Sequence, residues 1–256
     1  MPGTKPIGIL AALEEEMAEL EAVLSRPRGR ERAGVRFVAG RLDERPVVLA
    51  EAGIGKVSAA QVTTLLLDRF GCGAVVVSGV AGGLDPRLGI GDLVVAERLA
   101  QQDYGALTNG GMRNYRPGAP PFGERRHELY YTLPRGLGAR LRDALAGLEL
   151  PLLSAATTGS KPRRPELHFG TILSGDQFIN AAEARRALRR RFPGALAVEM
   201  EGAAAAQIAE RHGAPCVVVR AVSDLAGAES HVDFLAFLPA AGAAAAMAVR
   251  RILPAL

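Results

Sequence analysis

The sequence has few of the residues that build disulfide frameworks, thiolate metal sites or base-stacking surfaces. Its 256 residues include two cysteines, no tryptophan, four tyrosines and eight phenylalanines. Cys72 and Cys216 each stand beside an apolar run, and two cysteines are too few for a disulfide framework or a cysteine-based zinc site. We therefore expect two buried, reduced thiols and no surface that stacks nucleic-acid bases.

Long apolar runs are also lacking. The first run, 7–13, is short and ends in the acidic triplet 14–16, which is not the pattern of a signal peptide. The uncharged stretch 234–249 contains Pro239 and Gly242 and is shorter than the ~20 apolar residues that span a bilayer. We expect a packed C-terminal helix, no membrane partner and a cytoplasmic location.

Charge of one sign is not concentrated anywhere. The chain has 31 basic and 27 acidic residues, a net charge of +4, and only three of the basic residues are lysines. The arginines lie in short runs such as 163–164 and 189–191, with acids nearby, rather than in one basic stripe. This pattern favours a solvated arginine-rich surface and does not indicate a nucleic-acid partner.

Apolar runs that alternate with helical patterns predict an α/β fold with a central mixed sheet. No linker interrupts the chain, so we expect a single domain over residues 1–256. The expected strands are 7–13, 35–42, 46–51, 74–78, 92–96, 152–156, 168–174, 196–199 and 215–223. The expected helices are 14–24, 57–70, 136–146, 181–191, 202–212 and 234–252. The segment 103–134 is too rich in proline and glycine for either, which is typical of a functional or interface loop.

The ends of the expected strands carry the chemistry. Ligands of open α/β sheets bind outside the carboxyl ends of the strands. Here those ends run into 14–16, the glycine-rich turn 78–83, the segment 174–180, the acids of 199–201, and Arg220 followed by Ser223 and Asp224. Each feature alone has a plain structural explanation, such as acids in a first helical turn or an ion pair at a strand end. Their joint placement at one sheet edge indicates a site.

Three short motifs resemble known binding and catalytic signatures only in part. The turn Gly53-Ile54-Gly55-Lys56 continues as GxGxxS, so it fits neither the dinucleotide fingerprint nor the P-loop, and it predicts a tight turn near a ligand. The turn 78–83 lacks the GxSxG order of a nucleophile elbow. His127-Glu128 has no second histidine at zinc-binding spacing and the other histidines are scattered, so no metal site is predicted.

The sequence resembles bacterial 5′-methylthioadenosine/S-adenosylhomocysteine nucleosidases of the nucleoside phosphorylase superfamily. The matching blocks occur in family order and run along nearly the whole chain, at 7–16, 53–57, 79–84, 174–180, 198–201 and 219–224. The resemblance implies a three-layer α/β/α fold and hydrolysis of the N-ribosidic bond, with release of adenine and the 5-thio-substituted ribose in methionine salvage. It implies no metal or organic cofactor.

The resemblance also implies the catalytic residues. Asp224 corresponds to the acid that protonates adenine N7, with Ser223 orienting its carboxyl group. Glu16 corresponds to the residue that binds and activates the attacking water, assisted by Arg220. Glu201 corresponds to the carboxylate that holds the ribose hydroxyls and stabilises the developing positive charge.

The same resemblance implies the substrate-binding residues. Met200 packs against the ribose, Phe178 stacks on the purine, and the Ile179 backbone bonds the purine edge. Ile54 and Phe234 line the apolar pocket for the 5′ substituent, and a homodimer is implied in which the segment 103–134 reaches that pocket across the interface. Leu13 and Val80 stand where some family members carry methionine or serine. These differences, with the longer 103–134 segment, leave the identity of the 5′ group open.

Three other functions are compatible with the same residues. A phosphorylase would need cations for phosphate, and an anionic nucleophile beside Glu16 would be repelled. A hydrolase of another nucleoside, such as futalosine, would use the same mechanism, because backbone contacts to the purine edge leave no trace in the side chains. A non-catalytic nucleoside-binding module is disfavoured because Glu16, Glu201, Arg220 and Asp224 are all present.

Overall fold

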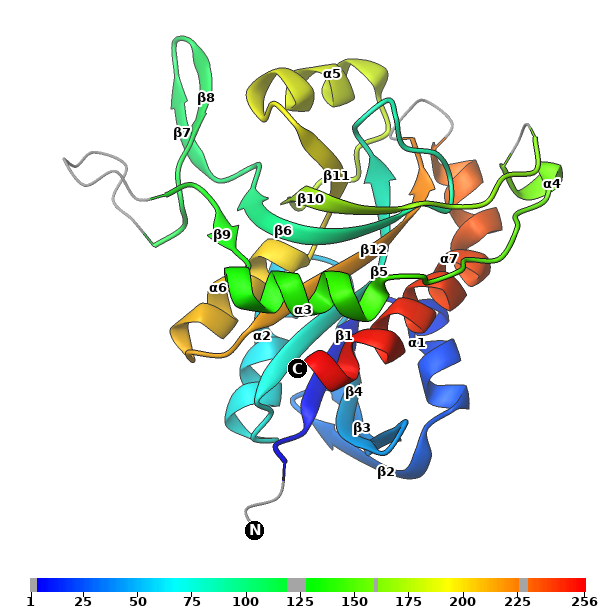
Figure 1. The fold of residues 1–256 in the computed structure, drawn as a ribbon. Coiled ribbons are helices and arrows are strands. Elements are labelled where there is room, and N and C mark those ends of the chain that lie inside the picture. The colour runs from blue at the N-terminus through cyan, green and yellow to red at the C-terminus, as the bar shows by residue number, and fades with distance from the viewer. Residues whose placement is uncertain (1–3, 119–127, 159–160, 226–229) are drawn as a thin grey trace.

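The computed structural model describes residues 4–118, 128–158, 161–225 and 230–256, with the backbone alone for Ala156 and residues 230–236. Within these residues a ten-stranded mixed sheet lies between two layers of helices (Figure 1). The predicted three-layer α/β/α fold is therefore confirmed. No helix of the described part is long and apolar enough to cross a membrane.

The centre of the sheet is built from strands that are buried on both faces. All five residues of β1 are buried, and β1 pairs in parallel with β4 and β5. Such strands read as continuous apolar runs, which is why the sequence revealed them. The inner strands are β1 (Ile7–Ala11), β4 (Arg45–Glu51), β5 (Ala74–Gly83), β6 (Leu93–Gln101), β10 (Leu167–Ser174), β11 (Ala195–Glu199) and β12 (Cys216–Asp224).

The sheet order is β11-β10-β6-β12-β5-β1-β4-β3-β2, with β9 (Tyr131–Thr132) beside β6. β2 (Ser25–Arg32) and β3 (Val35–Leu42) form one edge by antiparallel pairing. At the other end β11 pairs with β10 and also with the last residues of β5, where Ala197 lies opposite Gly83. This second pairing curls part of the sheet and brings the carboxyl ends of β5, β11 and β12 together.

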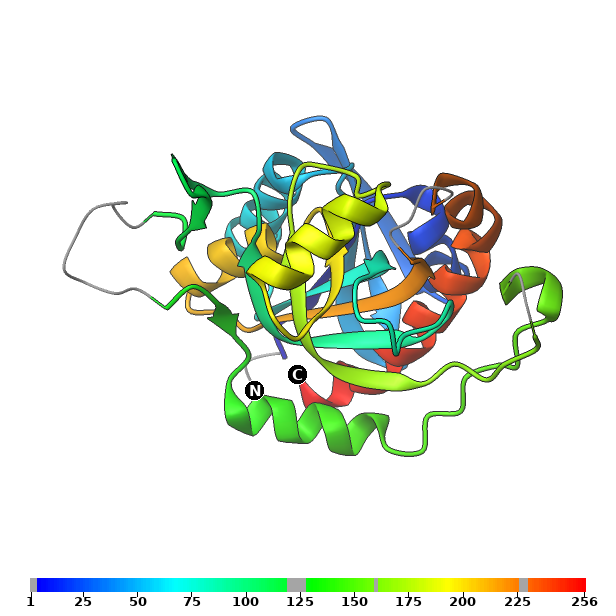
Figure 2. The ribbon, with the colours of Figure 1, turned by 90° about the horizontal axis from the view of Figure 1, so that it is seen from above.

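Helices cover both faces of the sheet, as the two views show (Figures 1 and 2). On one face lie α1 (Glu14–Ala22), α3 (Arg135–Leu145) and α7 (Ser230–Ile252), which share a core with Ile9 and Val76. On the other lie α2 (Lys56–Asp68) and α6 (Gly202–Arg211), which share a core with Leu10 and Val77. α5 (Ala182–Arg191) packs near β10 and β11, and the chain ends in the short helix η1 (Leu253–Ala255).

Some expected elements differ in the structure. The strand expected at 152–156 is wrong: Leu153 makes only an isolated bridge to Arg163, and Ser154 Oγ accepts the Thr157 N–H at 3.2 Å to begin the short helix α4 (Ala155–Thr158). The glycine turn expected at 78–83 is not a turn, because β5 continues through it to pair with β12 and β11.

Two strands and a hairpin were not expected. β2 has eight exposed residues, and the segment taken as irregular holds the hairpin of β7 (Gly105–Thr108) and β8 (Gly111–Asn114) as well as β9. The hairpin projects from the body of the molecule (Figure 1). Both cysteines are free, but only Cys72 is buried as expected, whereas Cys216 is half-buried.

Candidate active site

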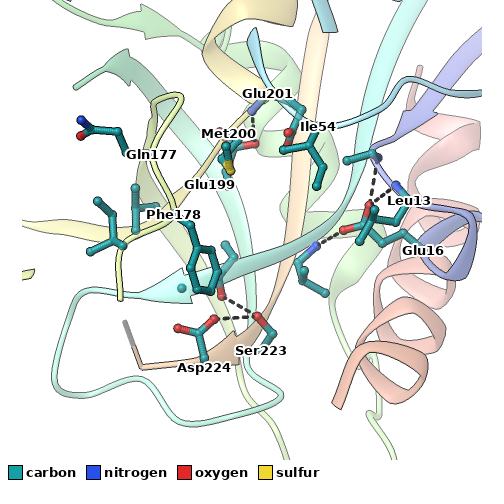
Figure 3. A pocket seen from close by; sticks show the side chains of 16 residues that line it. Leu13, Glu16, Ile54, Gln177, Phe178, Glu199, Met200, Glu201, Ser223 and Asp224 are labelled. Carbon is teal, nitrogen blue, oxygen red and sulfur yellow. Dashed lines mark hydrogen bonds between the residues drawn. The ribbon is translucent and has the colours of Figure 1, made fainter. Parts of the chain in front are cut away.

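A cavity of about 300 Å³ opens at the carboxyl ends of the central strands (Figure 3). Ten of the twelve residues singled out in the sequence line it: Leu13, Glu16, Ile54, Val80, Phe178, Ile179, Met200, Glu201, Ser223 and Asp224. In Figure 3, Glu16 and Leu13 lie at the right of the view, and Ser223 and Asp224 lie at the bottom, below the Phe178 ring. Glu201 and Met200 lie at the top. Residues from six separate chain segments therefore converge on one space.

Glu16 is fixed by backbone N–H groups. It is the third residue of α1, and from this position its side chain reaches back over the helix start. Oε2 accepts hydrogen bonds from the N–H groups of Ala12 (2.9 Å) and Leu13 (3.0 Å), and Oε1 accepts one from Val80 (2.9 Å). Burial raises the pKa of Glu16, although the charge of Arg220 and these three N–H groups oppose the shift.

Gly79 allows two charged side chains to approach the same stretch of backbone. A Cβ at this position would overlap both the Arg220 guanidinium and the Glu16 carboxylate, and the backbone has φ +148°. Only glycine tolerates both the space and the conformation. The neighbouring Val80 N–H is thereby free to hold Glu16.

Arg220 lies behind the cavity wall and is 1% exposed. Arg220 was expected to assist Glu16, but its Nη2 donates to Glu199 Oε2 and to Glu201 Oε2, the latter at 3.0 Å. Its Nη1 donates to the Ser78 carbonyl at 3.2 Å. Arg220 therefore acts on Glu16 through its charge, and it acts on Glu199 and Glu201 through hydrogen bonds.

Glu199 ends β11 and is surrounded by donors. Its carboxylate accepts the N–H groups of Glu201 (3.1 Å) and Gly202 (2.8 Å), the Ser174 hydroxyl and Arg220. No role was expected for Glu199, although it ends the strand that leads to Glu201. These bonds indicate that Glu199 holds Arg220 and the start of α6, although it lines the cavity together with Glu201.

Glu201 has the most informative electrostatics. Burial raises its pKa to about 7, and the nearby Glu199 and Glu16 add to this rise. Arg220 and the Gly55 N–H, which lies 2.8 Å from Oε1, oppose it. Burial lowers the pKa of Arg220, but the negative charges of these three acids raise it by more. The net shift is upward, so the guanidinium stays protonated. Three acids thus share one buried guanidinium.

Asp224 ends β12 and is almost fully buried. The Ser223 hydroxyl donates to Asp224 Oδ2 at 3.0 Å, which sets the orientation of the carboxyl group. Phe178 stands at the rim and is half exposed, on the side of the cavity where Asp224 lies (Figure 3). An acid beside an aromatic ring is an arrangement that suits a flat heterocycle.

The cavity has further lining residues besides the ten that were expected. Gln177, Glu199 and four small or apolar residues also line the cavity, although no site role was expected for them: Ala12, Ala81, Gly82 and Val198. Phe234 was expected in the apolar pocket, but its side chain lies outside the described residues. The described part holds no group of three or more His, Cys, Asp or Glu side chains suited to a metal ion.

Known proteins resemble this chain along its whole length. The family model described as the Phosphorylase superfamily matches residues 6–254. A Mycobacterium bovis protein named 5′-methylthioadenosine/S-adenosylhomocysteine nucleosidase is 44% identical over 250 residues, which cover 98% of this chain and 97% of that protein.

Solved structures show the same relationship. The nucleosidase of that name from S. pneumoniae, with the transition-state inhibitor MT-ImmA, has a TM-score of 0.82 and 32% identity and covers 98% of this chain and 99% of its own. The native futalosine hydrolase of Helicobacter pylori has a TM-score of 0.79 and 30% identity and covers 98% of each chain.

Proposed function

The chain belongs to the phosphorylase superfamily, and we propose that it hydrolyses the N-ribosidic bond of 5′-methylthioadenosine and S-adenosylhomocysteine. The products are adenine and the 5-thio-substituted ribose. The M. bovis relative and the S. pneumoniae structure carry the name of this activity. The proposal therefore joins a family relationship to the chemistry of the cavity.

The charge of the cavity carries the choice of water as nucleophile. Among the described lining residues are the carboxylates of Glu16, Glu199, Glu201 and Asp224, and none is lysine, arginine or histidine. Arg220 is already paired behind the wall. A phosphate dianion would meet like charges here without a cation to bind it, whereas neutral water would not. This observation favours hydrolysis over phosphorolysis.

The first chemical role falls to Asp224. With adenine stacked on Phe178 and its edge bonded by the Ile179 backbone, Asp224 donates its proton to N7 of the purine. The electron pair of the breaking C1′–N9 bond then moves into a neutral leaving group. General acid catalysis of this kind contributes about 10²–10⁴-fold in rate. The bond from the Ser223 hydroxyl keeps the carboxyl group aimed at the base.

Glu201 and Glu16 act on the sugar. The ionised Glu201 carboxylate accepts the ribose hydroxyls and stabilises the positive charge that develops on the ring. Glu16 accepts a proton from the water that attacks C1′, and its three N–H bonds hold it in place. Met200 packs on the ribose, while Leu13, Ile54 and Val80 supply apolar surface for the thioether at the 5′ end.

The assembly and location belong to the same proposal. We infer that the chain acts as one domain and forms a homodimer in the cytoplasm, where it serves methionine salvage. The support for a dimer is the resemblance of the sequence to this family, which implies that the segment 103–134 reaches the 5′ pocket across the interface. Sedimentation tests this: a fully active monomer would contradict a dimer that shares its active site.

The function is tested by measuring adenine release from 5′-methylthioadenosine in phosphate-free buffer, with chromatography of the sugar product. Free methylthioribose is the expected product. Release only after phosphate is added would indicate phosphorolysis. Futalosine is assayed in parallel, because the likeness to the H. pylori futalosine hydrolase makes that activity the second candidate. Hydrolysis of futalosine alone would replace the proposed substrate.

Asp224→Asn is the matched control for this assay. Asparagine keeps the shape and still accepts the Ser223 hydroxyl bond, but it has no proton to give. We expect turnover to fall by about 10²–10⁴-fold while substrate binding and thermal stability are retained. Turnover at the wild-type rate would remove Asp224 from the role of acid.

A further inference from the structure

A closed ring of polar contacts lies outside the cavity, where three chain segments meet. Lys56 begins α2, Asp103 follows β6 and Asp176 follows β10. Lys56 Nζ lies 2.6 Å from Asp103 Oδ1 and 3.7 Å from Asp176 Oδ2, and the Lys56 N–H donates to Asp176 Oδ1 at 2.8 Å. The Asp176 N–H donates to Asp103 Oδ2 at 2.8 Å. We call these three residues the Lys56 clamp.

The clamp is better shielded than an ordinary surface ion pair. The side chains of Lys56 and Asp103 are 15% and 19% exposed, whereas that of Asp176 is 48% exposed, so the shielding applies to the Lys56–Asp103 pair. Nζ also donates to Gln101 Oε1 at 3.3 Å, and Gln101 in turn donates to Gln207 of α6. Asp103 accepts bonds from the Lys56 ammonium and from the Asp176 N–H, and Asp176 accepts one from the Lys56 N–H, so the three segments hold one another. Contacts of this kind, partly buried and charge-assisted, are stronger than exposed ones.

The clamp connects two walls of the cavity. On one wall, Gly55 directly precedes Lys56 and donates its N–H to Glu201 Oε1. On the other, Asp176 stands two residues before Phe178. The walls approach so closely that a Cβ on Gly55, whose φ is +102°, would lie 3.2 Å from Asp176 Oδ1. Asp176 packs against the Gly55 turn and accepts the Lys56 N–H, so a shift of Asp176 would also shift the Gly55 N–H that bonds Glu201.

From this geometry we infer that Lys56 is a positioning residue for the proposed reaction, setting the distance between the ribose-binding carboxylate and the purine-stacking ring. The inference rests on the proposed function. Without the Lys56 ammonium, the carboxylates of Asp103 and Asp176 have no cation between them and repel each other. The loop that carries Phe178 then moves from the Gly55 turn, and both the stack and the Gly55–Glu201 bond weaken.

The loss has a signature that general destabilisation lacks. The groups around Glu201 are Arg220, Glu199, Glu16 and the Gly55 N–H. Of these, the clamp controls only the Gly55 N–H, which favours the ionised carboxylate. Loss of the Gly55 N–H bond therefore raises the pKa of Glu201, and the acid limb of the pH–rate profile moves to higher pH.

The test compares Lys56→Met with Lys56→Arg, using Lys161→Met as the control for the same substitution at an exposed site. We expect Lys56→Met to lower kcat/KM for 5′-methylthioadenosine about tenfold, mainly through a higher KM, as for one lost charge-assisted hydrogen bond. The acid limb should move upward. Lys56→Arg should restore most of the activity because it keeps the charge, and Lys161→Met should change nothing.

The outcomes separate the two proposals. A wild-type enzyme that releases no adenine contradicts the proposed function. An active wild type with Lys56→Met inside twofold of it in KM and pH profile overturns the clamp, as does a variant that loses only thermal stability. If Lys56→Met does not fold, Asp103→Asn carries the test: it causes no repulsion but removes the charge that holds the Lys56 ammonium, so smaller changes of KM and acid limb in the same direction are expected.

Discussion

Replacing Arg220 with methionine tests the electrostatics of the site directly. The substitution removes the guanidinium that bonds Glu199 and Glu201, and an unbranched apolar side chain fills much of the space. All three side chains are at most 6% exposed, so solvent screens the remaining charges only weakly. Removing one member of a buried ion pair typically costs about 3–5 kcal/mol, because the remaining charge is left uncompensated.

An exposed pair in the same protein supplies the control. Arg250 bonds Asp43 at 2.6 Å, a distance typical of a strong ion pair, but the two side chains are 42% and 49% exposed. Exposed pairs contribute about 0–1 kcal/mol. Arg250→Met should therefore destabilise the protein far less than Arg220→Met, although both delete an arginine.

The cost of Arg220→Met also depends on pH. The pKa of Glu201 is about 7 in the folded protein, above its ordinary value of 4.5, and the loss of Arg220 raises it further. Between these two values the folded state binds more protons than the unfolded state, so stability falls as pH rises. In the variant this window extends to higher pH. The destabilisation should therefore be smaller at pH 5 than at pH 7.5.

Urea unfolding of the wild type and both variants at pH 5 and pH 7.5 measures these free energies. The reasoning fails if Arg220→Met costs no more than Arg250→Met at pH 7.5. It also fails if the cost of Arg220→Met is the same at both pH values, since protonation of the carboxylates would then not relieve it.

Two further predictions follow from the crowding and the titration of the site. Gly79→Ala should abolish activity and lower the free energy of unfolding by about 1–3 kcal/mol, because its Cβ overlaps two fixed side chains. Gly29→Ala, with open space around it, should leave activity unchanged. Equal activity of the two variants would contradict this prediction. Glu201→Gln should remove the acid limb near pH 7 from the profile of kcat/KM, because only the ionised carboxylate stabilises the sugar cation. A profile that keeps this limb would assign it to another group.

The parts of the fold that could be predicted from the sequence are those in which burial acts on both faces. β1 and β12 read as apolar runs because neither face meets water, and β3 was predicted with its observed bounds. The site could be located because carboxyl ends of parallel strands meet at one edge. That rule needs only the strand order along the chain, not the way the sheet curls.

Elements without a buried face could not be found in this way. β2 has no buried residue, so it shows no alternation of apolar and polar positions, and only its pairing with β3 makes it a strand. The hairpin of β7 and β8 turns at Asn109-Gly110, a pair typical of hairpin turns, which was a usable signal in the segment taken as irregular. At 152–156 the apolar run was misleading, because the Ser154 side chain caps a helical turn instead.

The pairing of charges within the site was beyond sequence reasoning for a different reason. Glu199 and Glu201 lie two residues apart at the end of the same strand, and nothing in that spacing tells that both bond Arg220, or that Glu199 also holds the start of α6 while Glu201 accepts the Gly55 N–H. The sheet decides it, because β12 places Arg220 behind β11 and Gly79 lets it approach Glu16. The result is an excess of buried negative charge. This excess destabilises the folded protein, and the raised pKa of Glu201 is a sign of the same repulsion. Such an excess favours a sugar that becomes positively charged only as its bond breaks, so the same imbalance that weakens the fold lowers the barrier of the proposed reaction.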